Sequence, residues 1–160
     1  MVQQVSLGAP FNSKLIVTDG SFKDGCCGMA AIALDMTTQE WHEICSSGEG
    51  TSTLDAEIKA MALAMQWAID MNWSSITLLA DCLVAVNALK AKTLPDWKLA
   101  DVFFKAIDLA KSFNVCSFLH VTHDCITGVN DLAVQARVLR VVNSFTVGDG
   151  LPPVNPIFFP

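Results

Sequence analysis

The N-terminal half of the chain changes from short apolar runs to a long helical pattern. Three short runs are rich in residues that favour β-strands, and short polar segments connect them. This pattern predicts an antiparallel meander. These runs cover residues 14–18, 29–34 and 40–45. Ser52 and Asp55 then fit a capping box, and an Ala- and Met-rich stretch follows. This pattern predicts a helix from about residue 52 to residue 71.

The C-terminal half alternates strands and helices. Residues 76–80 are apolar except for Thr77, which is typical of a strand covered on both faces. Residues 115–121 predict another strand, and helices are expected over 81–90, 98–113 and 130–143. The order βββαβααβα predicts an α/β fold, with a five-stranded mixed sheet flanked by helices.

The pattern also divides the chain. Residues 14–143 are predicted to form one domain, which suits a total of 160 residues. Residues 1–13 form a short N-terminal segment, and residues 144–160 form a tail that contains Pro and Gly. We expect this tail to be extended or irregular.

Charge excludes one class of function. The formal net charge of −6 argues against a strongly basic nucleic-acid module, because such proteins bind mainly by neutralising phosphates. An enzyme that meets nucleic acid through metal ions remains compatible with it. No pair of the six cysteines has C-x-x-C spacing, which argues against zinc and favours free, reduced thiols.

Nothing in the sequence directs the chain to a membrane. Residues 1–12 lack the features of a signal peptide, and no uncharged apolar stretch approaches the ~20 residues of a membrane span. We therefore expect an intracellular protein of the nucleus or cytoplasm that is not secreted and has no membrane partner. A monomer is expected, and any protein partner is unknown.

Two acidic residues follow apolar strands. Strand alternation places Asp19 on one face with Leu15 and Val17. Asp81 directly follows the apolar run 76–80. Each has a structural alternative: Asp19 as a turn residue before Gly20, and Asp81 as a helix N-cap.

A third acid, Glu57, lies on the apolar side of its helix. A carboxylate that faces the core is costly unless it pairs or binds a cation. The alternative is a glutamate that reaches solvent from the first turns of the helix. Its polar counterparts gather on the opposite side: Asp55, Lys59, Gln66 and Asp70.

The three acids meet if the first and fourth strands pair. Converging carboxylates suit hard divalent cations such as Mg²⁺ or Mn²⁺. Two such ions about 4 Å apart are able to activate water and stabilise the leaving oxygen of a phosphodiester. The sequence therefore predicts a metal-dependent site at Asp19, Glu57 and Asp81.

The motifs around these acids, in their order and spacing, resemble the ribonuclease H family. The resemblance is strongest to plant ribonuclease H-like domains related to non-LTR retrotransposon reverse transcriptases, and it covers about residues 14–137. It is carried by Thr18-Asp19-Gly20-Ser21, Thr53-Leu54-Asp55-Ala56-Glu57, Ala80-Asp81-Cys82-Leu83, and the segment from His120 to Ala133.

The resemblance implies a ribonuclease H-like fold and two-metal hydrolysis of the RNA strand of RNA–DNA hybrids. Asp19, Glu57 and Asp81 match the metal-binding acids of the family, and His120 matches a mobile histidine that assists proton transfer or product release. By the same resemblance, Gly20, Ser21 and Thr53 are expected to contact nucleic acid. The alternative for His120 is a strand-end histidine with a satisfied hydrogen bond.

Two positions depart from the family pattern. Asn130 occupies the position of the fourth acid, so a second metal ion is expected to bind weakly; Asp131 would point about 100° away. Thr53 and Leu54 replace asparagines that contact the nucleic-acid backbone in the family.

These departures leave two main hypotheses. The first is a metal-dependent endonuclease acting on RNA–DNA hybrids. The second is a catalytically weak or decayed domain that binds nucleic acid or a protein partner. A generic α/β binding domain without metal is a third, and it requires the position of Glu57 to be accidental.

Overall fold

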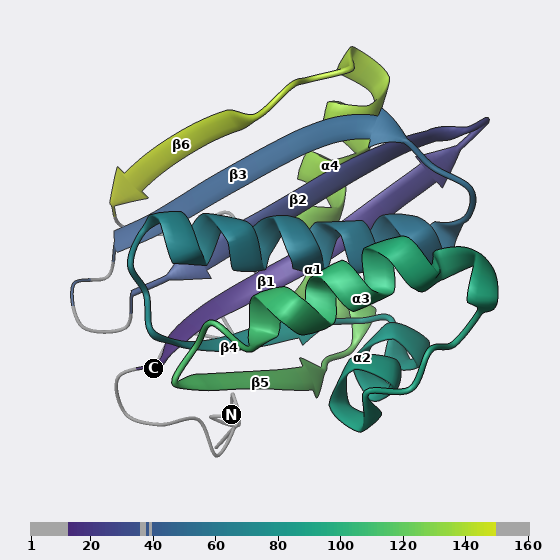
Figure 1. Cartoon of the computed structure of the whole chain (residues 1–160). Helices are drawn as coiled ribbons and strands as arrows, with labels where there is room; N and C mark the ends of the chain where they lie inside the picture. The colour runs from purple at the N-terminus through teal and green to yellow at the C-terminus, as the bar shows by residue number, and fades with distance from the viewer. Residues whose placement is uncertain (1–12, 36–37, 39, 150–160) are drawn as a thin grey trace.

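A computed structural model describes residues 13–35, 38 and 40–149, and the N-terminal segment and the last eleven residues lie outside this part. One mixed sheet forms its centre, with the strand order β5-β4-β1-β2-β3-β6 (Figure 1). The strands are β1 (Lys14–Lys23), β2 (Cys26–Leu34), β3 (Glu40–Glu49), β4 (Ser75–Ala80), β5 (Val115–His120) and β6 (Ser144–Asp149). The predicted antiparallel meander is confirmed, and so is the mixed sheet, because β4 pairs parallel with β1 and with β5.

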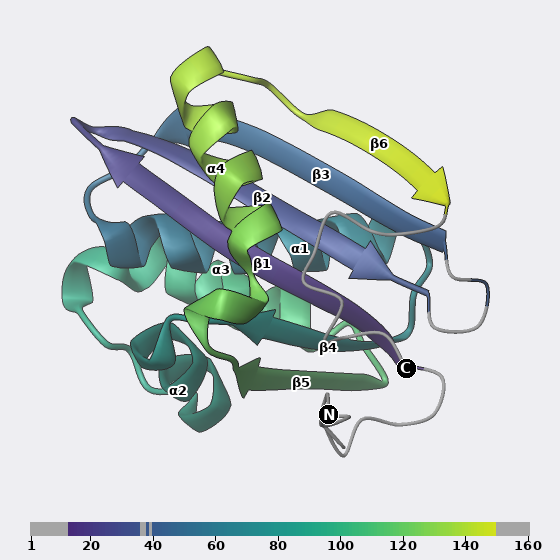
Figure 2. The same ribbon diagram turned by 180° about the vertical axis from the view of Figure 1, so that it is seen from behind.

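Helices cover both faces of the sheet. They are α1 (Thr53–Asp70), α2 (Leu83–Ala91), α3 (Ala100–Ala110) and α4 (Thr127–Leu139), with single 3₁₀ turns at Trp97–Leu99 and His123–Cys125. The helices α1, α2 and α3 lie on one face, and α4 crosses the other face (Figure 2). Within the described ranges, no helix is both long and apolar enough to cross a membrane.

Each face has its own apolar core. The core under α1 and α3 includes Ile58, Met61 and Phe103. The core under α4 joins Leu15 and Val17 of β1 to the helix side chains. This arrangement confirms the α/β fold class and explains the largely apolar sequence of β4, which is buried on both faces.

Two predictions about strands are wrong. The sheet has six strands instead of five, because β6 pairs antiparallel with the outer edge of β3. The predicted turn at Asp19 is part of β1, where Asp19 pairs with Ala30. The chain reverses at Asp24 and Gly25, which both have positive φ, so Gly20 is needed for another reason.

Helix boundaries also differ from the sequence pattern. The last helix begins at Thr127 and ends at Leu139, where Arg140 takes a left-handed conformation. The helix after β4 begins at Leu83, with Cys82 as its N-cap, so the N-cap alternative for Asp81 is wrong. All six cysteines are unpaired, in line with the expected reduced thiols.

Candidate active site

The sheet register brings Asp19 and Asp81 together. The parallel pairing of β1 and β4 aligns Val17 with Leu79. Continuing this register by two residues places Asp19 beside Asp81, which directly follows β4. The two aspartates are 62 positions apart in the chain, and the β1–β4 pairing predicted from the sequence is what makes them neighbours.

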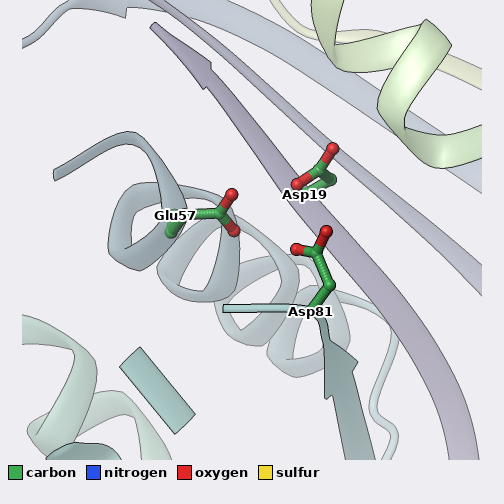
Figure 3. Close-up of side chains that lie close together, drawn as sticks. All are labelled: Asp19, Glu57 and Asp81. Atoms are coloured by element: carbon green, nitrogen blue, oxygen red, sulfur yellow. The ribbon is translucent and has the colours of Figure 1, made fainter. Parts of the chain in front are cut away.

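Glu57 reaches the same point from the first turns of α1. Ligand oxygens of Asp19, Glu57 and Asp81 all lie within 4.8 Å of one another. Figure 3 shows the three carboxyl groups directed toward a common point, from β1, α1 and the end of β4. The structure thus brings together all three acids singled out from the sequence.

A glycine allows this close approach. A Cβ built on Gly20 would lie 2.3 Å from the carbonyl carbon of Ala56 and 2.6 Å from the backbone nitrogen of Glu57. The backbones of β1 and α1 therefore touch beside the acids. Gly20 is required because of this contact, and it serves no turn.

The start of α1 is held by a buried carboxylate. The Oδ2 atom of Asp55 accepts hydrogen bonds from the Thr51 backbone N–H (2.9 Å) and from the Lys59 ammonium (3.0 Å). The Ser52 hydroxyl accepts from the Asp55 N–H, which confirms the predicted capping box. Asp55 was expected on the polar face, yet it is 3% exposed and fixes the helix turn that carries Glu57.

Among the residues that the structure describes, two buried oxygen atoms of the acid cluster lack hydrogen-bond partners. Asp19 is 2% exposed and Glu57 is 5% exposed. Within the described part of the chain, Asp19 Oδ2 and Glu57 Oε2 have no hydrogen-bond donor. Desolvation raises the pKa of both carboxyl groups, and the nearby charge of Asp81 raises the two pKa values further.

These observations fit a bound divalent cation. Buried carboxylate oxygens without donors carry a high cost in free energy, and a cation that they coordinate removes it. The donor set contains oxygen atoms alone, which is the set that Mg²⁺ and Mn²⁺ prefer. Asp19, Glu57 and Asp81 are therefore the residues suited to hold such an ion.

The raised pKa values give the site a pH dependence. A cation binds the deprotonated carboxylates, so it must displace the protons that Asp19 and Glu57 retain above their usual pKa. We expect the increase in melting temperature caused by 5 mM MgCl₂ to be small at pH 5.5 and larger at pH 8. Thermal unfolding with MgCl₂ or with EDTA at both pH values measures this. A larger increase at pH 5.5 would contradict it.

Two histidines contact Asp81 in different ways. Nδ1 of His123 lies 2.9 Å from Asp81 Oδ2, and this hydrogen bond raises the pKa of the imidazole. Nε2 of His120 lies 3.2 Å from the backbone oxygen of Asp81. Sequence reasoning selected His120 and missed His123. The spacing His-Val-Thr-His was the available signal, since the 3₁₀ turn after β5 folds His123 back over the strand end.

The remaining predicted residues lie around the acids. Thr53 is exposed at the first position of α1, and Ser21 is half-buried and accepts a hydrogen bond from Arg137 Nε (2.8 Å). Asn130 is half-buried near the start of α4, and Asp131 beside it is exposed. Asp131 does not belong to the cluster of acids found among the described residues.

The sequence profile of the reverse transcriptase-like family matches residues 17–136. No curated protein sequence matches the chain significantly.

Several solved structures of ribonucleases H are similar to this chain in fold. Ribonuclease H1 from Halobacterium salinarum is 18% identical, with a TM-score of 0.68 over 78% of this chain and 96% of that chain. The N-terminal ribonuclease H domain of a Mycobacterium tuberculosis protein is 17% identical, with a TM-score of 0.73 over 80% of this chain and 95% of that chain. LC11 ribonuclease H1 was isolated from compost by metagenomics and solved with an RNA/DNA hybrid. It is 16% identical, with a TM-score of 0.70 over 79% of this chain and 98% of that chain. At these identities the likeness establishes the fold.

Proposed function

The chain belongs to the reverse transcriptase-like family and has a ribonuclease H-like fold, and from this premise we propose that it is a metal-dependent endonuclease that hydrolyses the RNA strand of RNA–DNA hybrids. The observation that carries the proposal is the convergence of Asp19, Glu57 and Asp81, with buried oxygens that lack donors. A structural ion pair does not account for this cluster, because all three groups are acids.

Asp19, Glu57 and Asp81 would hold Mg²⁺ or Mn²⁺. When bound, divalent cations supply Lewis acidity that activates water and stabilises negative charge on a leaving oxygen. Asp19 and Glu57 release their protons before they can serve as ligands. His123 orients the Asp81 carboxylate through its Nδ1 atom, so it is a positioning residue.

Two cation positions are part of the proposal. The second would be held weakly, because Asn130 offers a neutral amide oxygen where the family has an acid. His120 is exposed and lies at the end of β5, where its imidazole can exchange protons with solvent. It is the candidate for proton transfer, and Gly20, Ser21 and Thr53 are the candidates for contact with nucleic acid.

The two histidines are expected to respond differently to substitution. His120→Ala should lower kcat by about 10²-fold at saturating metal, because a proton-transfer group is lost. His123→Ala should raise the metal concentration needed for half-maximal rate by about 10-fold, and saturating metal should restore kcat. Metal titrations of both variants measure the two effects. Equal losses of kcat at saturating metal would contradict the separation of roles.

The proposal is tested by a cleavage assay on an end-labelled RNA–DNA hybrid in Mg²⁺ and in Mn²⁺. Cleavage of the RNA strand is expected in both metals, and EDTA should abolish it. Single-stranded RNA and double-stranded DNA of the same sequence are the controls. No cleavage by the folded protein in either metal would overturn the enzyme proposal and leave a decayed domain that binds nucleic acid or a protein partner. The net charge of −6 and Asn130 are the observations that favour that second candidate.

The same proposal extends to the cell. An RNA–DNA hybrid is the proposed partner, and a retrotransposon-derived nuclease meets it in the nucleus or the cytoplasm. A monomer is sufficient for this function, because one chain supplies all three acids. The free thiols support an intracellular location, where disulfides are rare.

A further inference from the structure

Both arginines of this acidic chain line one pocket. Arg137 lies in the last turn of α4, and Arg140 follows the helix directly. The pocket has a volume of about 420 Å³ and lies between the end of α4 and the strand ends of β2 and β3. Figure 2 shows α4 crossing the sheet from the β4 side toward β3, so its C-terminal end lies over these strands.

The two guanidinium charges are not neutralised. Arg137 donates one hydrogen bond, from Nε to the Ser21 hydroxyl (2.8 Å), which leaves its two terminal nitrogens available. No ion pair in the described ranges involves Arg137 or Arg140. Glu49 is the one acid that lines the pocket, and it is exposed. Two unpaired guanidinium groups that line one pocket attract an anion, and their planar forks match phosphate oxygens.

Two glycines that line the pocket have no side chain that would narrow it. A Cβ built on Gly25 or Gly48 would have no atom within 4 Å, so both residues face open space. Gly25 has a φ of 78°, which favours glycine in any case, whereas Gly48 lies in a strand and has no such requirement. The wall formed by the arginines is therefore accessible to a ligand as broad as a nucleic-acid backbone.

Arg137 links the pocket to the acid cluster. Its partner Ser21 is two residues beyond Asp19 on β1, and the two side chains share one face of the strand. Two residues of a strand span about 7 Å. A polymer bound at the acids is therefore long enough to reach the arginine pocket, whereas a single small anion held in the pocket would not reach the acids.

We propose that the Arg137–Arg140 pocket binds a phosphodiester group of the nucleic-acid substrate, away from the phosphate that is cleaved. This inference rests on the proposed function and adds a second contact that is independent of metal. It explains how a chain with a net charge of −6 can hold a polyanion. The positive charge is local, and it lies on the α4 face of the sheet.

The test is binding of a fluorescein-labelled RNA–DNA hybrid to the full chain, measured by anisotropy between 50 and 300 mM NaCl. All proteins carry Asp19→Asn, so that the hybrid stays intact. Arg140→Gln should weaken binding about 5- to 10-fold at 100 mM NaCl and reduce the slope of log K against log[NaCl] by about 1. Arg137→Gln should act in the same direction. Lys105→Gln removes one positive charge from an exposed position on α3 and is the matched control, with less than a twofold effect expected.

Each outcome decides one claim. Arg140→Gln has no described contact to lose, so a loss of binding without a change in melting temperature supports a direct contact. Binding that is as insensitive to both arginine variants as to Lys105→Gln overturns the pocket and leaves the proposed function intact. If the parent protein binds no hybrid at any salt concentration, the pocket fails, and the cleavage assay on the wild-type chain decides the proposed function separately.

Discussion

Asp19→Asn is expected to lower the rate of hybrid cleavage by about 10³-fold, which corresponds to about 4 kcal/mol of transition-state stabilisation. Asp19 lies on β1, beside both Asp81 and α1. An amide keeps the shape of the side chain and removes the negative charge that a cation requires. Initial rates at saturating Mg²⁺ measure the loss.

The same substitution is expected to stabilise the metal-free protein. In the folded chain, desolvation and the nearby charge of Asp81 raise the pKa of Asp19. The protonated side chain therefore contributes stability that is fully present below the normal pKa of an aspartate and is lost as the pH rises through the raised pKa. Asn removes the buried charge that destabilises the fold at pH 8. A gain of about 1–2 kcal/mol, or roughly 3–6 °C in Tm, is expected in EDTA. At pH 4 the gain should nearly vanish.

Asp24→Asn is the matched control for both effects. Asp24 is exposed at the β1–β2 turn with a φ of 50°, a conformation that asparagine adopts readily. Cleavage rate and Tm should both stay close to wild type in this variant. An Asp19→Asn protein that keeps a tenth of the wild-type rate, or that melts below wild type in EDTA at pH 8, would show that Asp19 is a structural residue.

Gly20→Ala is expected to be the most destabilising single change in the site. The added Cβ would lie 2.3 Å from the carbonyl carbon of Ala56 and 2.4 Å from its oxygen. These are backbone atoms of a helix, so α1 would have to move as a unit. Overpacking of this kind costs about 3 kcal/mol, or roughly 6–12 °C in Tm.

Displacement of α1 also moves Glu57 away from Asp19 and Asp81. The Mg²⁺-induced increase in Tm should therefore be lost together with stability. Gly48→Ala is the control for stability, because a Cβ there has no atom within 4 Å. Its effect is expected within about 0.5 kcal/mol. A Gly20→Ala protein as stable as Gly48→Ala would contradict the close contact of β1 with α1.

Much of the fold follows from local pattern. The meander, the apolar run of β4 and the capping box at Ser52 are all visible in short windows, because strand and helix periods repeat within a few residues. The sixth strand is different. Residues 144–149 carry only a short alternation, with Phe145 and Val147 between polar residues, and they were assigned to the tail. They become β6 because the edge of β3 offers unpaired backbone groups.

The acids themselves were visible in the sequence, and their surroundings were not. Glu57 stands out because it breaks the apolar side of a helix, and Asp81 because it follows an apolar strand. That Asp19 lies within β1 depends on its partner Ala30, and the turn-like Gly20 is explained only by the packing of Ala56 against it. Both facts come from pairing between distant segments.

By itself, the sequence determined the α/β class, the order of its elements and the three acids that carry the candidate chemistry. The tertiary structure decided the partners of the side chains on and around these acids: His123 on the Asp81 carboxylate, the Thr51 backbone on Asp55 at the start of α1, and Arg137 on Ser21. The physical reason is the separation along the chain of the residues that interact. Periodicity and capping are set by neighbours within one or two turns, whereas the partner of a side chain is set by sheet register and by helix docking across the whole chain.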